Sequence, residues 1–170
     1  IEKELGAKVD ALFSSMEHAP VASASLSQVY RGVLHTGDIV AVKVQRPDIE
    51  RIIESDISLM ESIAEWIGEH LEDRLIDPAG IVREFARSIR RELDFEVEAR
   101  VAQQFALNFK DDPAVVIPRV FTTHCARRVL TLEWIDGVPV DTLDAYAERN
   151  SSPAEIARIG CRSLCEMVFE

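Results

Sequence analysis

A lysine inside an apolar strand pattern is the first residue whose type and position could do chemistry. Lys43 follows Val40, Ala41 and Val42, and in an extended strand it shares a face with Ala41 while the two valines lie on the other face. A lysine on a half-buried strand is costly unless its ammonium group meets an anion. It is therefore either an edge lysine that discourages pairing with other chains, or a binding lysine beside which Ala41 leaves room for a flat ligand.

Carboxylates gather at a second place, within residues 90–99 of an expected helix. Asp94 and Glu98 are four residues apart and share a helix face, where two negative charges repel unless a cation lies between or above them. Glu92 falls on nearly the opposite face, so it has a different partner or the helix does not run straight through it. The alternative is an ordinary acidic, solvated face, because 30 Asp and Glu outnumber 19 Lys and Arg.

Small residues make the third candidate site. Ala22, Ser23, Ala24 and Ser25 lie between two apolar segments, where a phosphate-binding loop usually carries glycines. Backbone amides and serine hydroxyls can still face a phosphate, but Cβ atoms restrict φ relative to glycine. The sequence therefore predicts a phosphate-binding loop that is stiffer than a glycine-rich one.

The fourth candidate is a strand that ends at a glycine turn. Residues 129–135 have the pattern of a strand, and Asp136 and Gly137 end it. Most such segments are only strand ends. Backbone that is exposed just beyond a buried strand can, however, bind the donor and acceptor edge of an adenine.

Hydrophobic periodicity predicts the elements that must position these residues. Apolar residues at helical spacing predict helices over residues 1–16, 47–71 and 77–105, the last as two helices or one with a bend. Period-two patterns predict strands over residues 26–34, 39–45, 115–121 and 128–135. A short helix is expected over 141–149, and a capping box at 152–155 begins a final helix.

Composition excludes several classes of protein. A chain of 170 residues that is 47% hydrophobic can form one full domain or two small lobes. Its net charge of -11 disfavours nucleic acid as a partner. No apolar run approaches the ~20 residues of a membrane span, and the N-terminus is too charged for a signal peptide. Three cysteines form neither an even framework nor a CxxC pair, so we expect a reducing, intracellular setting.

The order of these features is that of a protein-kinase N-lobe followed by the start of a C-lobe. PVASASLSQVY at 20–30, VAVKVQRP at 40–47 and ELDFEVEA at 92–99 together resemble the UbiB-type atypical kinases. The resemblance covers most of residues 1–137. It implies an α+β, protein-kinase-like fold, with an antiparallel N-lobe and inserted helices over 1–137 and the first C-lobe helices over 138–170.

The resemblance also implies ATP as cofactor and assigns residues to its parts. The alanine-rich loop would cover the phosphates, and Lys43 would contact the α- and β-phosphates and pair with Glu98. Leu132 would take the gatekeeper position, and the backbone of Glu133, Trp134 and Ile135 would form the hinge.

Two further residues, Glu92 and Asp94, would be the family's regulatory ExD pair, which faces an N-terminal helix with a KxGQ motif. That motif does not occur in this chain. The catalytic aspartate and the Mg²⁺ ligands are expected beyond Glu170. We therefore expect no catalytic residue and no metal ligand within these residues, and no phosphoryl transfer by this segment alone.

The parent protein would be an atypical kinase or ATPase that supports isoprenoid-quinone (ubiquinone) biosynthesis at the cytoplasmic face of a membrane or in the cytoplasm. Its partners would be nucleotide and quinone-biosynthesis proteins or lipid precursors, with membrane association through parts outside this chain. A non-catalytic pseudokinase scaffold or lipid-binding regulator with the same fold is the alternative. An aminoglycoside-type phosphotransferase shares the lysine strand but not the alanine-rich loop joined to ELDFEVEA.

Overall fold

The computed structural model describes residues 1–70, 77–142, 146 and 151–169. Short elements come first in the chain, namely α1 (Glu2–Leu5), α2 (Val9–Leu12), β1 (Phe13–Met16) and β2 (Ala22–Ser23). The hairpin β3 (Ser27–Leu34) and β4 (Ile39–Gln45) is followed by three helices, α3 (Ile49–His70), α4 (Pro78–Glu92) and α5 (Phe95–Asn108). The short 3-10 helix η1 (Thr122–His124), β5 (Val129–Glu133) and α7 (Pro153–Phe169) complete the described elements.

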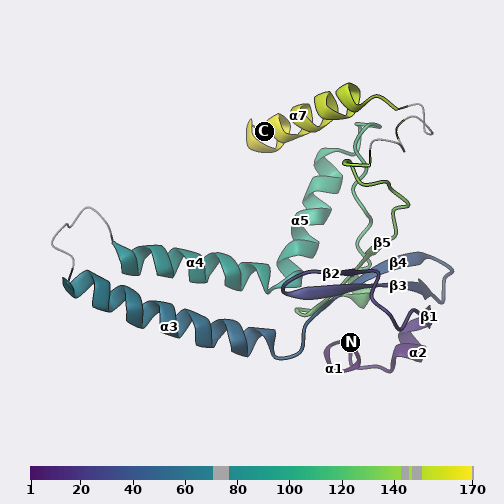
Figure 1. The fold of residues 1–170 in the computed structure, drawn as a ribbon. Helices are drawn as coiled ribbons and strands as arrows, with labels where there is room; N and C mark the ends of the chain where they lie inside the picture. Colours follow the sequence, from purple (N-terminus) through teal and green to yellow (C-terminus); the bar gives the residue numbers. More distant parts are fainter. Residues whose placement is uncertain (71–76, 143–145, 147–150, 170) are drawn as a thin grey trace.

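One antiparallel sheet organises the described residues, in the strand order β1-β3-β4-β5 with β2 paired to β3. The β3–β4 hairpin confirms the predicted strands, and its turn contains Gly37 at φ 91°, a conformation that glycine adopts without steric cost. The helices α3 and α4 pair along their lengths and project from the sheet, while α5 rises from the end of α4 toward α7 (Figure 1).

Alternation along the strands divides the core between the two faces of the sheet. On one face, five buried residues form a cluster against which α1 and α2 pack: Phe13, Leu34, Val40, Val42 and Val129. On the other face, Leu130 packs with Phe95 and Ala99 of α5. Lys43 and Ala41 lie on this second face, as the alternation predicted.

Two predicted elements were wrong. The helix expected over 1–16 is instead two single turns and a strand, because Gly6 at φ 70° ends α1 and β1 pairs with β3, which buries Phe13 to 1% exposure. The strand expected over 115–121 forms only an isolated bridge between Val120 and Leu132. Pro118 lies in that segment and has no amide hydrogen to donate to a ladder.

The predicted helical region 77–105 is two helices, α4 and α5, separated at Leu93 and Asp94. Asp77 caps the first by accepting from the amide of Gly80 at 2.9 Å, and proline follows it at the first helical position. Most of the short helix predicted over 141–149 lies outside the described residues. Among those that are described, no helix has both the length and the apolar character needed to cross a membrane.

Candidate functional site

Lys43 meets Glu98 of α5 at the centre of the candidate site. The lysine Nζ lies 2.9 and 2.7 Å from the two carboxylate oxygens of Glu98, although 55 residues separate them in the chain. The side chains are 30% and 42% exposed, so the pair is open to solvent on one side. The same Nζ lies 4.7 Å from the centre of the Phe95 ring, which gives the ammonium a second favourable neighbour. This ammonium can therefore contact an anion that enters from the solvent side.

The break between α4 and α5 explains how the carboxylates of this region are separated. Asp94 is the N-cap of α5, and its Oδ1 accepts from the amide of Glu96 at 3.0 Å. A cation was expected between Asp94 and Glu98. That cation is Lys43, and of the two carboxylates it binds Glu98, one turn into α5. Glu92 ends α4 and is exposed, as expected if the helix does not run straight.

A pocket of about 380 Å³ is lined by residues of both α4 and α5. Glu92 and Glu98 both line it, together with Arg87 and Arg91. Glu92, the predicted regulatory carboxylate, therefore lines the same pocket as Glu98, the partner of Lys43. Asp94 is not among the residues that line it.

The alanine-rich loop is held by hydrogen bonds, although residues 22–25 are all exposed. Ala22 and Ser23 form β2 and pair with β3. The amide of Ala24 donates to the carbonyl of Ser27 at 2.8 Å, and the carbonyl of Ala24 accepts from Arg46 Nε at 3.0 Å. These contacts restrict the loop further than its Cβ atoms do.

Small and apolar residues lie beside Lys43 on β4 and on the neighbouring β5. Ala41 lies opposite Leu132 in the β4–β5 register, and Lys43 lies opposite Leu130. Just beyond β5, the amide of Trp134 donates to the carbonyl of Ile39 at 3.0 Å, which joins the predicted hinge to β4. Beside Lys43 the sheet face therefore presents Ala41, Leu130 and Leu132, and the backbone of the predicted hinge follows directly after β5.

Sequence reasoning missed two residues of this region. Arg31 places its guanidinium 5.5 Å from the centre of the Trp134 ring, at the hinge end of the same sheet face. Gln45 lies two residues beyond Lys43 on β4 and is 8% exposed. The sequence contained the same indication for both residues. Each is a polar residue at a strand position whose side chain lies on the same face of the sheet as Lys43 and Ala41.

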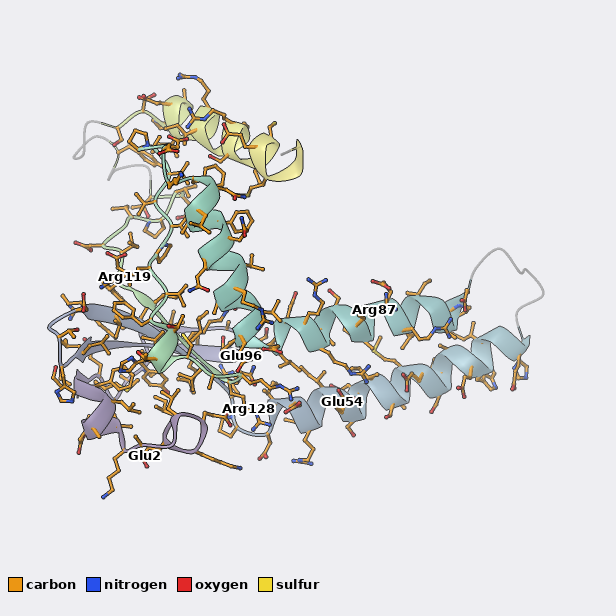
Figure 2. The ribbon with its side chains drawn as sticks, turned by 180° about the vertical axis from the view of Figure 1, so that it is seen from behind. Glu2, Glu54, Arg87, Glu96, Arg119 and Arg128 are labelled. Carbon is orange, nitrogen blue, oxygen red and sulfur yellow. The ribbon has the colours of Figure 1, made fainter. Side chains whose placement is uncertain are left out.

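Two carboxylates whose pKa values are shifted, Glu54 and Asp38, lie outside the Lys43–Glu98 pair. Hydrogen bonds from the Arg90 guanidinium of α4 lower the pKa of Glu54 on α3. Figure 2 shows Glu54 on α3, which runs alongside α4. A hydrogen bond from Thr36 lowers the pKa of Asp38, with a further contribution from Arg119. Within the described ranges, no group of three or more His, Cys, Asp or Glu side chains could hold a metal ion.

Comparison with known proteins identifies the family. The model of the ABC1 atypical kinase-like domain matches residues 1–170. The chain belongs to the ABC1 (UbiB) family of atypical kinases. The resemblance noted in the three sequence motifs is thereby confirmed, and so is the α+β, kinase-like fold class.

Several ABC1 relatives are similar over most of this chain. Protein ACTIVITY OF BC1 COMPLEX KINASE 1, chloroplastic, of Arabidopsis thaliana is 46% identical over 81% of the chain and 20% of its own length. Probable protein kinase UbiB of Aeromonas salmonicida is 36% identical over 99% of the chain and 31% of its own length. The chain thus spans about a fifth to a third of these relatives.

A solved ABC1-like structure matches the fold as well. The structure of Rv3197 from Mycobacterium tuberculosis in complex with erythromycin aligns with a TM-score of 0.72 and 33% identity. The alignment covers 82% of this chain and 34% of that one. The sheet and its helices are therefore an arrangement that a related protein adopts.

Proposed function

We propose that this chain is the nucleotide-binding part of an ATP-dependent atypical kinase or ATPase. The observation that carries the proposal is the Lys43–Glu98 ion pair, at 2.7 Å, on a sheet face that also presents Ala41 and lies near an alanine-rich loop. In this proposal, residues 1–137 form the N-lobe and 138–170 begin the C-lobe.

The residues present fit a nucleoside triphosphate. Lys43 carries the positive charge for the α- and β-phosphates, and Glu98 fixes the direction of its flexible side chain. The amides and serine hydroxyls of residues 22–25 can donate hydrogen bonds to phosphate oxygens. The space beside the small Ala41 accepts the adenine, with Leu132 as gatekeeper.

The backbone of Glu133, Trp134 and Ile135 follows Leu132 and is assigned as the hinge that binds the adenine edge. Mg²⁺ would offset phosphate charge when bound, and the proposal assigns its ligands and the catalytic aspartate to parts of the protein outside this chain. Glu92 and Asp94 are assigned a regulatory role at the α4–α5 break. Glu92 supports that role by lining the pocket that Glu98 also lines.

Calorimetry of Mg-ADP and Mg-ATP binding to the intact protein tests the proposal. Lys43→Ala and Glu98→Ala should each weaken binding by tenfold or more, which is about 1.4 kcal/mol. Glu96→Ala is the matched control, because Glu96 lies on the same helix and is exposed, and its affinity should stay within twofold. Wild type that binds no nucleotide would exclude the enzyme and favour the non-catalytic scaffold or lipid-binding regulator.

For the biological role, we propose support of isoprenoid-quinone biosynthesis, an inference from the UbiB relatives. The partners would be quinone-biosynthesis proteins or lipid precursors, at the cytoplasmic face of a membrane or in the cytoplasm. The test is complementation of a bacterial strain that lacks its own UbiB, with ubiquinone measured by chromatography. Restored ubiquinone that is lost again with Lys43→Ala supports the role, and unchanged deficiency with well-expressed protein contradicts it.

A further inference from the structure

We propose that Gln45 is a positioning residue that holds α5 in place so that Glu98 meets Lys43. This inference rests on the proposed nucleotide site and names what fixes its geometry. The Gln45 side chain donates from Nε2 to the carbonyl of Leu93 at 2.5 Å. Leu93 is the C-cap of α4 and directly precedes Asp94, the N-cap of α5.

Strand geometry makes Gln45 and Lys43 act on the same helix. The two residues are two apart on β4, so their side chains leave the same face about 7 Å apart. Lys43 binds Glu98, one turn into α5, and Gln45 binds Leu93, just before that helix. The strand therefore holds the start of α5 at two points, and Gln45 supplies the point that is independent of charge.

The contact with Leu93 is buried on both sides. Gln45 is 8% exposed and Leu93 is 3% exposed, so loss of the hydrogen bond leaves a carbonyl of a buried residue without its partner. A second hydrogen bond holds the same break between the helices, because the amide of the buried Phe95 donates to the carbonyl of Arg127 at 2.9 Å. Phe95 in turn lies under the Lys43 ammonium. Movement of α5 away from the sheet would have to break both contacts.

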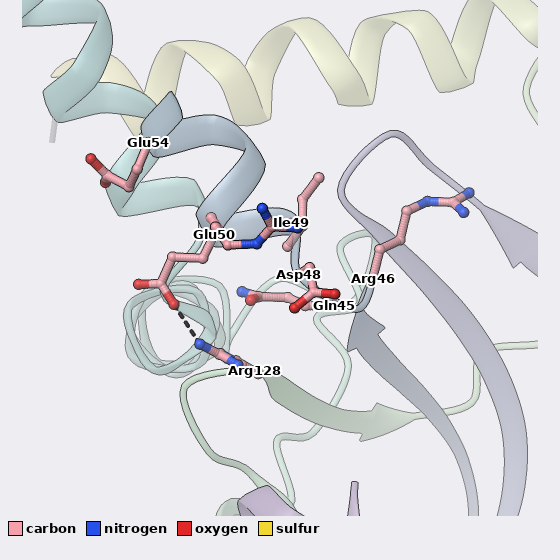
Figure 3. A pocket seen from close by; sticks show the side chains of 8 residues that line it. Gln45, Arg46, Asp48, Ile49, Glu50, Glu54 and Arg128 are labelled. Carbon is pink, nitrogen blue, oxygen red and sulfur yellow. Dashed lines mark hydrogen bonds and ion pairs between the residues drawn. The ribbon is translucent and has the colours of Figure 1, made fainter. Parts of the chain in front are cut away.

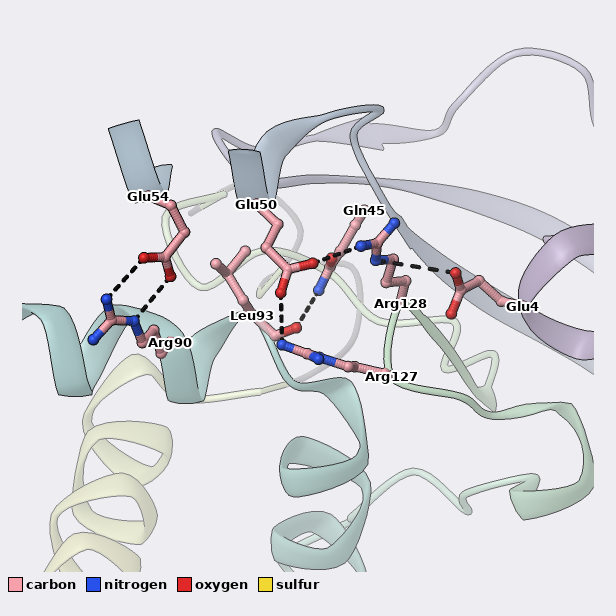
Figure 4. Close-up of polar contacts among 8 residues, drawn as sticks. All are labelled: Glu4, Gln45, Glu50, Glu54, Arg90, Leu93, Arg127 and Arg128. Carbon is pink, nitrogen blue, oxygen red and sulfur yellow. Dashed lines mark hydrogen bonds and ion pairs between the residues drawn. The ribbon is translucent and has the colours of Figure 1, made fainter. Parts of the chain in front are cut away.

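The charged side chains near Gln45 form ion pairs with one another, while the side-chain amide of Gln45 donates to the Leu93 carbonyl. A pocket of about 320 Å³ opens beside Gln45, and in its wall Glu50 of α3 binds Arg128 (Figure 3). The other oxygen of Glu50 binds Arg127 at 2.7 Å (Figure 4). The backbone amide of Gln45 donates to the carbonyl of Arg128 at 3.1 Å. This hydrogen bond holds the end of β4, from which the Gln45 side chain projects.

These contacts fix the position of Glu98 before nucleotide binds. A helix that carries the lysine partner but has only that ion pair to hold it could move away whenever the ion pair opens. Here a neutral, buried hydrogen bond holds the same helix, so the position of Glu98 should not depend on bound nucleotide or on salt concentration. Arg46, the next residue, binds the alanine-rich loop, so the end of β4 holds both the loop and the helix.

The test uses Gln45→Met in the intact protein, because methionine has similar length and cannot donate the hydrogen bond. Gln104→Met is the matched control, since Gln104 lies on α5 and makes an exposed side-chain hydrogen bond to Asn108. The first measurement is amide hydrogen exchange without nucleotide. Peptides that cover residues 93–99 should exchange about tenfold faster in Gln45→Met and at the wild-type rate in Gln104→Met.

The second measurement is Mg-ATP affinity in a double-mutant cycle. Gln45→Met should weaken binding about tenfold in the wild-type background and less than twofold in a Glu98→Ala background, because its effect passes through Glu98. An equal loss in both backgrounds would show a general structural effect and overturn the proposal. Wild-type exchange at residues 93–99 in Gln45→Met would overturn it as well.

The two measurements separate this inference from the proposed function. If wild type binds no nucleotide, the proposed function fails, while faster exchange at residues 93–99 still supports the Gln45 contact. If Gln45→Met does not fold, Gln45→Asn replaces it, because asparagine keeps the amide but is one methylene too short to reach Leu93. Wild-type exchange and affinity in Gln45→Asn would equally overturn the proposal.

Discussion

Leu130→Ala should destabilise the contact between the sheet and α5 more than any surface change on that helix. Leu130 is fully buried and packs against Phe95 and Ala99, which are 2% and 7% exposed. Removing the side chain deletes three carbon atoms, worth about 2.4 kcal/mol at ~0.8 kcal/mol for each buried methylene. Its neighbours lie on a helix that is fixed at its start, so they cannot collapse fully into the space, and the cavity raises the expected cost to about 3 kcal/mol.

The assay is equilibrium urea unfolding of the intact protein, followed by circular dichroism and by tryptophan fluorescence, to which Trp134 beside β5 contributes. Leu107→Ala is the matched control, because Leu107 lies on α5 and is 63% exposed, and its change should stay within about 0.5 kcal/mol. The packing argument is refuted if Leu130→Ala costs less than about 1 kcal/mol, or if both variants cost the same.

Three further predictions concern single groups in the described residues. Thr131→Val should cost about 1–2 kcal/mol in urea unfolding, because the buried hydroxyl donates to the carbonyl of His124 at 2.7 Å, and unchanged stability would contradict it. Burial raises the pKa of the Cys125 thiol, so its contribution to stability is full below the unfolded-state pKa and is lost as pH rises through the folded-state pKa. Mass spectrometry should accordingly find Cys125 alkylated more slowly than the exposed Cys161 at about pH 8, and equal rates would contradict it. Asp77→Ala removes the cap of α4 and should cost about 1 kcal/mol, while Asp77→Asn should be nearly neutral. The prediction is contradicted if Asp77→Ala has the same urea-unfolding midpoint as Asp77→Asn and wild type.

Much of the fold could be predicted because it depends on local pattern. Alternation along residues 39–45 assigned Lys43 and Ala41 to one face, and the structure buries the valines on the other. The turn at Gly37 and the Asp77 cap also depend on a few adjacent residues. Such features are readable from sequence because their causes lie within one turn or one strand.

The errors arose where distant residues decide local structure. Residues 13–16 have helical spacing, yet pairing with β3 and burial of Phe13 make them a strand. Residues 115–121 alternate like a strand but pair with β5 only at Val120. In both segments the available partner, not the pattern, selected the conformation.

For the candidate site, the sequence by itself determined which residue types were present and which face each occupied. It indicated that Lys43 needs an anion, but the choice of Glu98 over Asp94 was decided by the break at Leu93, which turns α5 toward β4. It gave no partner for Gln45, because the carbonyl it binds belongs to a residue 48 positions away. Contacts of that range depend on how the sheet and helices pack, and only the tertiary structure brings their two sides together.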